Sequence, residues 1–243
     1  MKKKGLINFY ELPHFEKYIV KHENPNYDIN KMPFKHPFMS VIVGATGSGK
    51  SNVLMNLIKE LNNTFEYIYI ITQNKSEPLY EGLEEIIEKP YLTILEGIEA
   101  FNKLDIKSLP IGQTLMVFDD MCIETEKKQQ KICEMYIRGR KELDKRGISC
   151  IYLTQSYYDT PNVIRKQADK VILKKINNKY DKDAIIRDGI GLDIDKGKLN
   201  DIYNYCVKSK DDITNFLLID KGASDEYRLR KNFDEVLNVD DFL

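Results

Sequence analysis

A glycine-rich segment constrains the fold of this chain more than any other part of its sequence. It follows the apolar run at 39–43 and precedes a stretch with apolar residues at helical spacing, and it reads Gly44, Ala45, Thr46, Gly47, Ser48, Gly49, Lys50, Ser51. Glycines allow backbone N–H groups to turn inward and surround an anion, and a following helix adds the positive end of its dipole. The sequence therefore predicts a strand, a phosphate-binding loop and a helix, in that order.

The spacing of this segment fits the pattern GxxxxGK[ST], which predicts binding of ATP together with Mg²⁺. In this pattern the ammonium of Lys50 would reach the β and γ phosphates, and the hydroxyl of Ser51 would ligate Mg²⁺. A chance glycine-rich turn is the alternative. The flanking strand and helix argue against it, so we expect residues 44–51 to hold the nucleotide.

Strands and helices are expected to alternate along the chain. Short apolar or β-branched runs occur at 39–43, 67–71, 91–95, 115–118, 150–153 and 171–173, with a further edge strand expected at 216–219. Helical patterns occupy 79–87 and 127–145. This alternation predicts an α/β protein of the P-loop NTPase class, a three-layer sandwich around a mainly parallel sheet.

Two aspartates end the apolar run at 115–118. A magnesium nucleotide requires a carboxylate at the tip of a neighbouring strand, and Asp119 stands where such a metal ligand is expected. Asp120 follows it, where a base would orient and deprotonate the attacking water. Many hydrolases of this type carry Glu there, so the shorter Asp leaves the reach of this base open. An acidic turn after a buried strand is the alternative.

Gln155 ends the apolar run at 150–153, where an apolar residue would be less costly to bury. A sensor of the γ-phosphate explains this placement, and a turn or helix-capping amide is the alternative. The sensor interpretation favours a RecA-like ATPase of the additional-strand type over a simple P-loop kinase.

Basic residues cluster between the strand of Asp119 and the strand of Gln155. In a ring of subunits one arginine could reach a neighbour's γ-phosphate and stabilise the transition state. The alternative is the solvated C-terminal end of a helix, where cations suit the dipole. The candidates are Arg138, Arg140 and Arg146.

Composition excludes several other functions. A net charge of −1 over 243 residues argues against a surface coated with basic residues, so contacts to DNA would have to be local. The four cysteines show no CxxC spacing, which favours free thiols over a zinc site. No apolar stretch approaches the roughly 18 residues of a membrane span, and no secretion signal follows the N-terminal lysines. Lys174, Lys175 and Lys179 could line a pore, although ordinary surface lysines are favoured slightly.

The chain divides into three expected parts. Residues 1–37 hold four of the eight prolines and are expected to form an N-terminal arm. Residues 38–221 form the expected ATPase domain. Residues 222–243 are charged and sparsely apolar, which predicts a mobile C-terminal tail; docking of residues 240–243 on a capsid or a neighbour is the alternative.

From about residue 37 to residue 173 the chain resembles the genome-packaging ATPases of large DNA viruses and virophages, within the FtsK/HerA branch of P-loop motors. The resemblance depends on the glycine-rich segment with its preceding strand, on Val117-Phe118-Asp119-Asp120, and on Ile151 to Ser156. Gly139-Arg140-Lys141, placed before a strand that ends in Thr-Gln-Ser, makes it more specific than the glycine loop alone. The compact size also resembles virophage members.

The resemblance implies an ATP hydrolase that translocates double-stranded viral DNA into a preformed capsid. It implies a homo-oligomeric ring, pentamer or hexamer, that acts in the host cytoplasm at a viral factory, with a capsid protein as a further candidate partner. Arg140 would act in trans, and Gln155 would be the sensor. A HerA-like cellular helicase and a non-translocating assembly factor are the alternatives.

Two departures from the family pattern bear on the site. Asp120 replaces a common Glu, and Lys141 replaces the His that viral members usually have. The spacer at 142–146 is also longer than usual, so Arg146 could be the trans arginine, and Arg138 is a further alternate.

Overall fold

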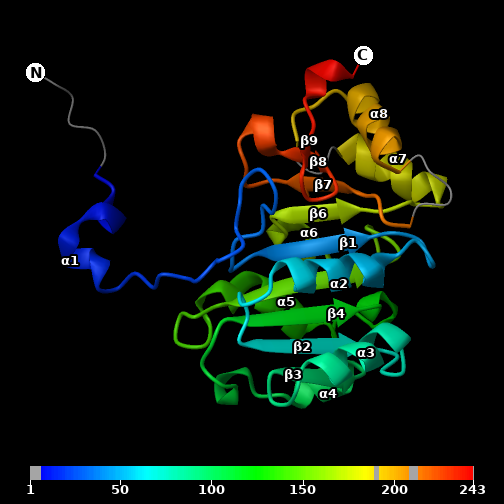
Figure 1. The fold of residues 1–243 in the computed structure, drawn as a ribbon. Coiled ribbons are helices and arrows are strands. Elements are labelled where there is room, and N and C mark those ends of the chain that lie inside the picture. The colour runs from blue at the N-terminus through cyan, green and yellow to red at the C-terminus, as the bar shows by residue number, and fades with distance from the viewer. Residues whose placement is uncertain (1–6, 189–191, 208–212, 243) are drawn as a thin grey trace, which may run out of the picture.

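The chain folds into three layers, with one large sheet between two layers of helices (Figure 1). The structure is a computed structural model that describes residues 7–188, 192–207 and 213–242. Its strands are β1 (Met39–Val43), β2 (Tyr67–Thr72), β3 (Leu92–Glu96), β4 (Thr114–Asp119), β5 (Ile148–Thr154), β6 (Lys170–Leu173), β7 (Leu217–Asp220), β8 (Leu229–Lys231) and β9 (Glu235–Val236). The helices are α1 (Pro13–Glu16), α2 (Lys50–Glu60), α3 (Pro78–Ile86), α4 (Ile98–Lys103), α5 (Gln130–Arg138), α6 (Asn162–Gln167), α7 (Lys179–Asp188) and α8 (Lys196–Val207).

The strand order fixes the class of ATPase. The sheet runs β3-β2-β4-β5-β1-β6-β7-β8-β9, and β3 to β6 are parallel, whereas β7, β8 and β9 are antiparallel. The strand that ends in Asp119 is thus separated from the phosphate-loop strand β1 by β5, the strand that precedes Gln155. This confirms the predicted P-loop fold with an additional strand.

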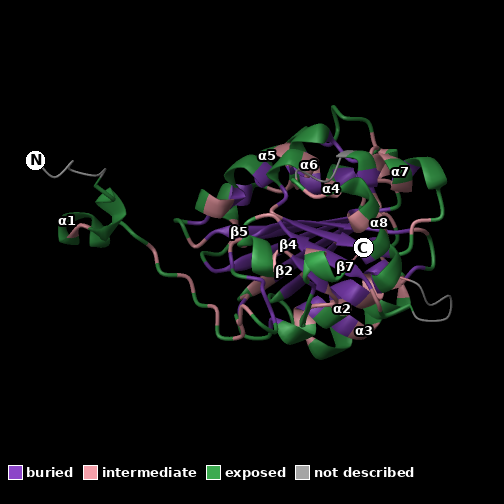
Figure 2. Cartoon of the chain, turned by 90° about the horizontal axis from the view of Figure 1, so that it is seen from above, coloured by how far each residue is buried: buried purple, intermediate pink, exposed green. Residues whose placement is uncertain are grey.

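Alternation along the strands divides the core between the two faces of the sheet. In β1, Met39, Val41 and Val43 point to one face and Ile42 points to the other. The first face is covered by α4 to α8, and the second is covered by α2 and α3 (Figure 2). The inner strands are therefore buried on both sides, which explains their nearly continuous apolar sequences.

The predicted helix at 127–145 is shorter in the structure. Helix α5 ends at Arg138 and a 3₁₀ turn covers 139–141. Gly139 packs so closely on β5 that a Cβ there would lie 3.3 Å from the carbonyl oxygen of Ile148. Further along the chain, residues 143–145 have positive φ angles, which a right-handed helix cannot accommodate.

The expectation of a mobile C-terminal tail is wrong for residues 229–237. Strand β8 pairs with β7, which is therefore not the edge strand, and β9 pairs with β8. Arg230 is fully buried, and its guanidinium donates hydrogen bonds to the carbonyl oxygens of Phe233 and Ile29. Leu229 and Leu237 are buried in the core, and Phe233, Val239 and Phe242 pack against it. Because these residues are widely spaced in the tail, the sequence shows no strand pattern there.

The expected arm at 1–37 consists of two different parts. Residues 32–34 are buried against the domain, and Phe34 packs edge-to-face on Phe38. Residues 7–21, which include α1, stand away from the body in both ribbon views (Figures 1 and 2). Only this outer part is an arm.

Candidate functional site

The glycine-rich loop lies at the carboxyl edge of the parallel strands, between β1 and the first turn of α2. The backbone N–H of Gly44 donates to the carbonyl of Thr154 at the end of β5, 3.1 Å away. Lys50 is 9% exposed, and its ammonium donates to the carbonyl oxygen of Gly44 at 3.1 Å. The lysine therefore folds back over the loop, at the place predicted for the phosphates.

None of the three glycines of the loop can be replaced without strain, and Gly47 has a positive φ of 72°. Gly49 has a φ of 87°, and a Cβ there would lie 2.5 Å from the carbonyl oxygen of Ile213. A Cβ at Gly44 would lie 2.5 Å from the Cβ of Lys174. Lys174 is buried, and its ammonium donates to the carbonyl oxygens of Ile213 and Asn215. Lys174 thus packs against Gly44 and stabilises the loop. Because its side chain is buried, it does not line a pore.

Asp119 ends β4 inside the protein, close to Lys50. Burial raises the pKa of its carboxyl to about 6; the hydrogen bond from Tyr80 and the charge of Lys50 lower it, and Asp120 and Glu77 raise it. The phenol of Tyr80, from α3, donates to Oδ2 of Asp119 at 2.7 Å. The carboxylate is thus held in a fixed orientation near the loop. Tyr80 could not be predicted from the sequence, because nothing in the spacing of α3 connects it with β4.

Replacing Tyr80 with phenylalanine is expected to raise the pKa of Asp119 further. A hydrogen bond that stabilises the carboxylate is lost, so the carboxyl takes up its proton at a higher pH. The acid limb of the pH profile of ATP turnover should then move upward by about one pH unit. Tyr152→Phe is the matched control, since it removes another buried phenol, one that donates to Gln129 at 2.7 Å. An unchanged acid limb in Tyr80→Phe would rule out this role.

Asp120 follows β4 in a left-handed conformation with a φ of 52°. Such a conformation is uncommon for a residue other than glycine, and it turns the side chain out of the strand direction. Its backbone N–H donates to the carbonyl of Leu153 at 3.3 Å. Within the described residues, its buried Oδ1 atom has no hydrogen-bond partner. This oxygen is therefore available to a water, a metal or a nucleotide.

Gln155 follows β5 directly and lies beside the glycine-rich loop. Its Oε1 atom accepts a hydrogen bond of 2.9 Å from the hydroxyl of Thr46. The side chain is exposed, so the burial cost expected from the sequence does not arise here. The structure thus brings Gln155, the loop, Asp119 and Asp120 to the same edge of the sheet.

The loop after Gln155 is anchored by Asp181, a residue that no motif in the sequence indicates. Asp181 of α7 accepts a hydrogen bond from the Ser156 hydroxyl at 3.3 Å and another from the backbone N–H of Tyr157 at 3.3 Å. Burial raises the pKa of this carboxyl. The contact joins α7 to the residues that follow Gln155, so a movement of one would be transmitted to the other.

The three arginine candidates lie at the opposite, amino edge of the strands. Arg140 forms an ion pair of 2.7 Å with Asp169, which also accepts from the backbone N–H of Met39, the first residue of β1. Arg146 lies 3.6 Å from Glu66, and Arg138 is exposed. None of the three is brought to the glycine-rich loop of its own chain.

The fold is shared with solved structures of low sequence identity. The genome packaging NTPase B204 from Sulfolobus turreted icosahedral virus 2, in complex with ATP-gammaS, is 18% identical with a TM-score of 0.51, over 84% of this chain and all of the other. EccC (ATPases 2 and 3) from Thermomonospora curvata, in complex with a signal sequence peptide, is 12% identical with a TM-score of 0.51. It is matched over 83% of this chain and 38% of its own length. These similarities support the P-loop fold.

Comparison of sequences identifies the family. No curated protein sequence matches the chain significantly. The family model described as Poxvirus A32 protein matches residues 26–188, well over half of the chain and the whole region from the glycine-rich loop to α7. The chain belongs to the Poxvirus A32 protein family and, with that family, to the P-loop ATPases.

Proposed function

We propose that this ATPase is the motor that packages viral double-stranded DNA into a preformed capsid, working as a homo-oligomeric ring. The observation that carries the proposal is the contact between Gln155 and Thr46, in a chain of the Poxvirus A32 family. Gln155 follows a strand inserted between the phosphate-loop strand and the strand of Asp119. A side chain there can report the state of the γ-phosphate to the loop around it.

The proposed roles of the site residues follow their positions. Residues 44–51 surround the phosphates, and the ammonium of Lys50 leaves its loop carbonyls for the β and γ phosphates. Asp120 orients and deprotonates the attacking water. Gln155 exchanges its bond to Thr46 for one to the γ-phosphate, and the loop anchored by Asp181 carries the change to α7.

The oxygen atoms at this edge of the sheet fit a magnesium ion whose remaining ligands come from the nucleotide and from water. Within the described ranges, no three His, Cys, Asp or Glu side chains come together to hold a metal alone. Mg²⁺ is commonly held by one or two carboxylates plus phosphates and waters, so Ser51 and Asp119 suffice as protein ligands. Its chemistry would be to neutralise charge that develops on the β and γ phosphates. Asp120 is not needed as a metal ligand, and its unpartnered Oδ1 atom can accept a hydrogen bond from the attacking water.

A ring would complete each site with an arginine from a neighbouring subunit. Arg140 is our first candidate, with Arg138 and Arg146 as alternates. The ion pair between Arg140 and Asp169 would have to open for this role, whereas Arg138 is already exposed. An arginine supplied in trans typically raises turnover by about 10³- to 10⁵-fold.

The remaining proposals concern the setting. Within the part of the chain that the structure describes, no helix is both long and apolar enough to cross a membrane. Packaging places the protein in the host cytoplasm, at a viral factory, with a capsid protein as a second partner. A virophage origin is one form of this proposal.

The test is ATP turnover with and without duplex DNA, together with displacement of a third strand from a DNA triplex. A packaging motor should be stimulated by the duplex and should displace the third strand only while it hydrolyses ATP. An ATP turnover rate that is the same with and without duplex DNA would instead indicate an assembly factor. Unwinding of a forked duplex, without displacement from the triplex, would indicate a helicase.

A further inference from the structure

A groove of about 460 Å³ opens next to the glycine-rich loop, between α2 and the turns that flank β7 and β8. One wall comes from α2, where Asn52 and Asn56 stand about one turn apart and Asn52 directly follows Ser51. The other wall comes from the residues before β7 and after β8. Because β7 begins opposite the end of β6, this wall stands at the same edge of the sheet as the loop. We call this cavity the Asn52 groove.

Residues 213–215 connect the Asn52 groove with the glycine-rich loop. A Cβ at Gly49 would lie 2.5 Å from the carbonyl oxygen of Ile213, so the two backbones are in contact. The ammonium of Lys174 donates to the carbonyl oxygens of Ile213 and Asn215. Thr214, between them, lines the groove. A molecule whose phosphates lie in the loop therefore has the groove within reach of its remaining part.

The Asn52 groove has an apolar floor and a polar rim. Val53 and Phe216 are buried in it, and the rings of Phe216 and Phe233 meet edge-to-face with 5.0 Å between their centroids. Phe233 is only partly buried, so a flat ring can pack against it. The exposed side chains of the rim are Lys31, Asn56, Glu60, Thr214 and Asp234. An apolar cavity with a few polar groups is typical of a site for a small organic ligand.

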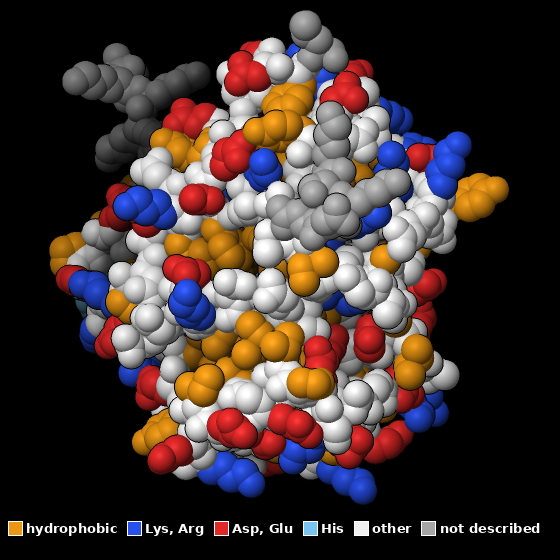
Figure 3. Space-filling model, turned by 45° about the vertical axis from the view of Figure 1, so that its right-hand side comes forward, with side chains coloured by type: hydrophobic (Ala, Val, Ile, Leu, Met, Phe, Trp, Pro, Cys, Tyr) orange, Lys and Arg blue, Asp and Glu red, His pale blue; other side chains and the backbone are white. Residues whose placement is uncertain are grey.

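The surface around the loop shows the same character. In Figure 3, which brings the carboxyl ends of the parallel strands forward, hydrophobic side chains gather in hollows of the surface. Such hollows next to a phosphate-binding loop suit the base of a nucleotide, whose flat faces are apolar and whose edges carry donors and acceptors.

The side chain of Asn52 supplies a donor and an acceptor at this groove. Its backbone carbonyl accepts from Nδ2 of Asn56 at 2.8 Å, but within the described residues its own side-chain amide forms no hydrogen bond. An asparagine amide can pair with N6 and N7 of adenine through two hydrogen bonds, because adenine offers one donor and one acceptor there. Guanine offers two acceptors, O6 and N7, on the same edge. The amide of Asn52 therefore suits adenine better than guanine.

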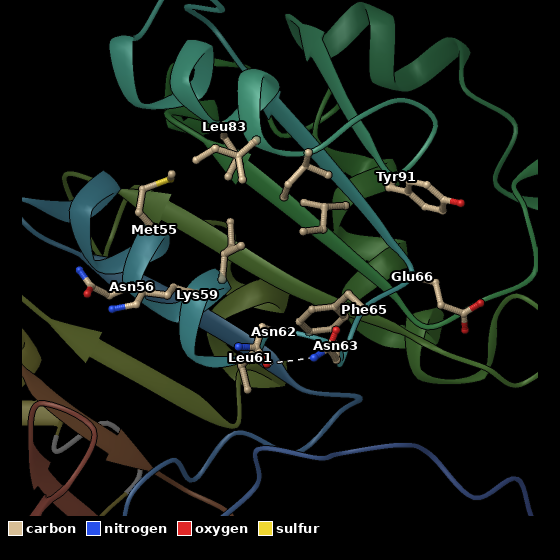
Figure 4. Close-up of a pocket in the computed structure, with 14 residues that line it drawn as sticks. Met55, Asn56, Lys59, Leu61, Asn62, Asn63, Phe65, Glu66, Leu83 and Tyr91 are labelled. Atoms are coloured by element: carbon tan, nitrogen blue, oxygen red, sulfur yellow. Dashed lines mark hydrogen bonds between the residues drawn. The ribbon is translucent and has the colours of Figure 1, made fainter.

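Another cavity beside α2 is larger, at about 550 Å³, but it lies too far along the helix for this role. In Figure 4 Met55 of α2 and Leu83 of α3 face each other across it. Its lining begins at Met55 and continues to the turn after α2, and it includes no residue from 44–54. This cavity therefore provides a control rather than a site for the base.

We propose that the Asn52 groove holds the adenine of ATP while residues 44–51 hold its phosphates. The base packs against Phe233 and the apolar floor, and the amide of Asn52 pairs with the edge of the base. The groove thus selects adenine nucleotides over guanine nucleotides. The proposal deepens the proposed function and rests on it in one respect, namely that the phosphates lie in the glycine-rich loop.

Steady-state turnover of the full chain with ATP and with GTP tests the groove. The parent should have the lower KM for ATP, and Asn52→Ala should raise that KM about tenfold with little change in kcat. The same change should bring the KM values for ATP and GTP together. Thr214→Trp places a large ring at the rim, so it should raise the KM for both nucleotides. Met55→Trp is the matched control, since it places the same ring in the other cavity, and it should leave both KM values unchanged.

Inorganic tripolyphosphate separates the groove from the loop, because it carries the phosphates without a base. It should compete with ATP, and its inhibition constant should be the same in the parent, Asn52→Ala and Thr214→Trp. Unchanged KM values for ATP in both groove variants would reject the groove and leave the loop standing. Equal weakening of ATP and tripolyphosphate would also reject it, because the variants would then act through the loop. If tripolyphosphate failed to compete with ATP in the parent chain, the loop would not hold the phosphates, and the proposed catalytic site would fail together with the groove.

Discussion

Lys50→Ala is expected to lower ATP turnover by about 10²- to 10³-fold or more, the loss seen when one preorganised donor aimed at developing charge is removed. The ammonium lies in the loop itself, bonded to the carbonyl of Gly44 and close enough to Asp119 to lower the pKa of that carboxyl. No other cation among the described residues is bonded to this loop's carbonyl oxygens. Alanine therefore leaves the transferring phosphate without its positive partner.

Lys59→Ala is the matched control for this prediction. It removes the same charge from the same helix, α2, at an exposed position. Its turnover should stay near that of the parent chain, and thermal unfolding should show that both variants are folded. If Lys50→Ala hydrolysed ATP at the parental rate while folded, the glycine-rich loop would not be the catalytic site.

Sequence alone predicted the parts of this fold that repeat a strong local pattern. Continuous apolar runs mark the strands at 39–43 and 67–72, and apolar residues at helical spacing mark the helix after Gly49. Each pattern is typical of one kind of secondary structure. The polar strand ends could be ordered because parallel strands present their carboxyl ends at one edge. Asp119, Asp120 and Gln155 thus came together as expected.

Long-range packing accounts for what the sequence did not predict. Helices α7 and α8 carry many polar residues between the apolar side chains that reach the core, such as Ile185, Leu199 and Ile202, so their apolar pattern is weak. Strand β8 is three residues long and gains its place by pairing with β7. The bond from Tyr80 to Asp119 joins residues 39 positions apart, a contact that no local spacing encodes.

The position of the arginine cluster also depends on long-range packing. The cluster at 138–146 was visible in the sequence, but its place at the amino edge depends on the end of α5 at Arg138 and on the turn that follows. Arg140 then finds Asp169 in its own chain. Which arginine serves a neighbouring site is a property of the assembly, so a single chain leaves all three as candidates.

Asp120→Asn is expected to lower turnover by about 10²- to 10⁴-fold, the range for a positioned acid–base group. The amide keeps the size of the side chain and can still touch a water, but it cannot accept the proton. Nucleotide binding should persist, because Lys50 and the loop are unchanged. A binding curve with a fluorescent ATP analogue, measured beside turnover, separates the two effects.

Asp120→Glu is the informative companion, because it restores a carboxylate with a longer reach. The buried Oδ1 atom of Asp120 has no hydrogen-bond partner among the described residues, and the left-handed φ of 52° sets the direction in which a longer carboxylate would extend. Glutamate should therefore recover a large part of the activity that asparagine loses. If both variants kept parental turnover, the water would be activated by another group. If both also lost nucleotide binding, Asp120 would act through the metal or the loop rather than as the base.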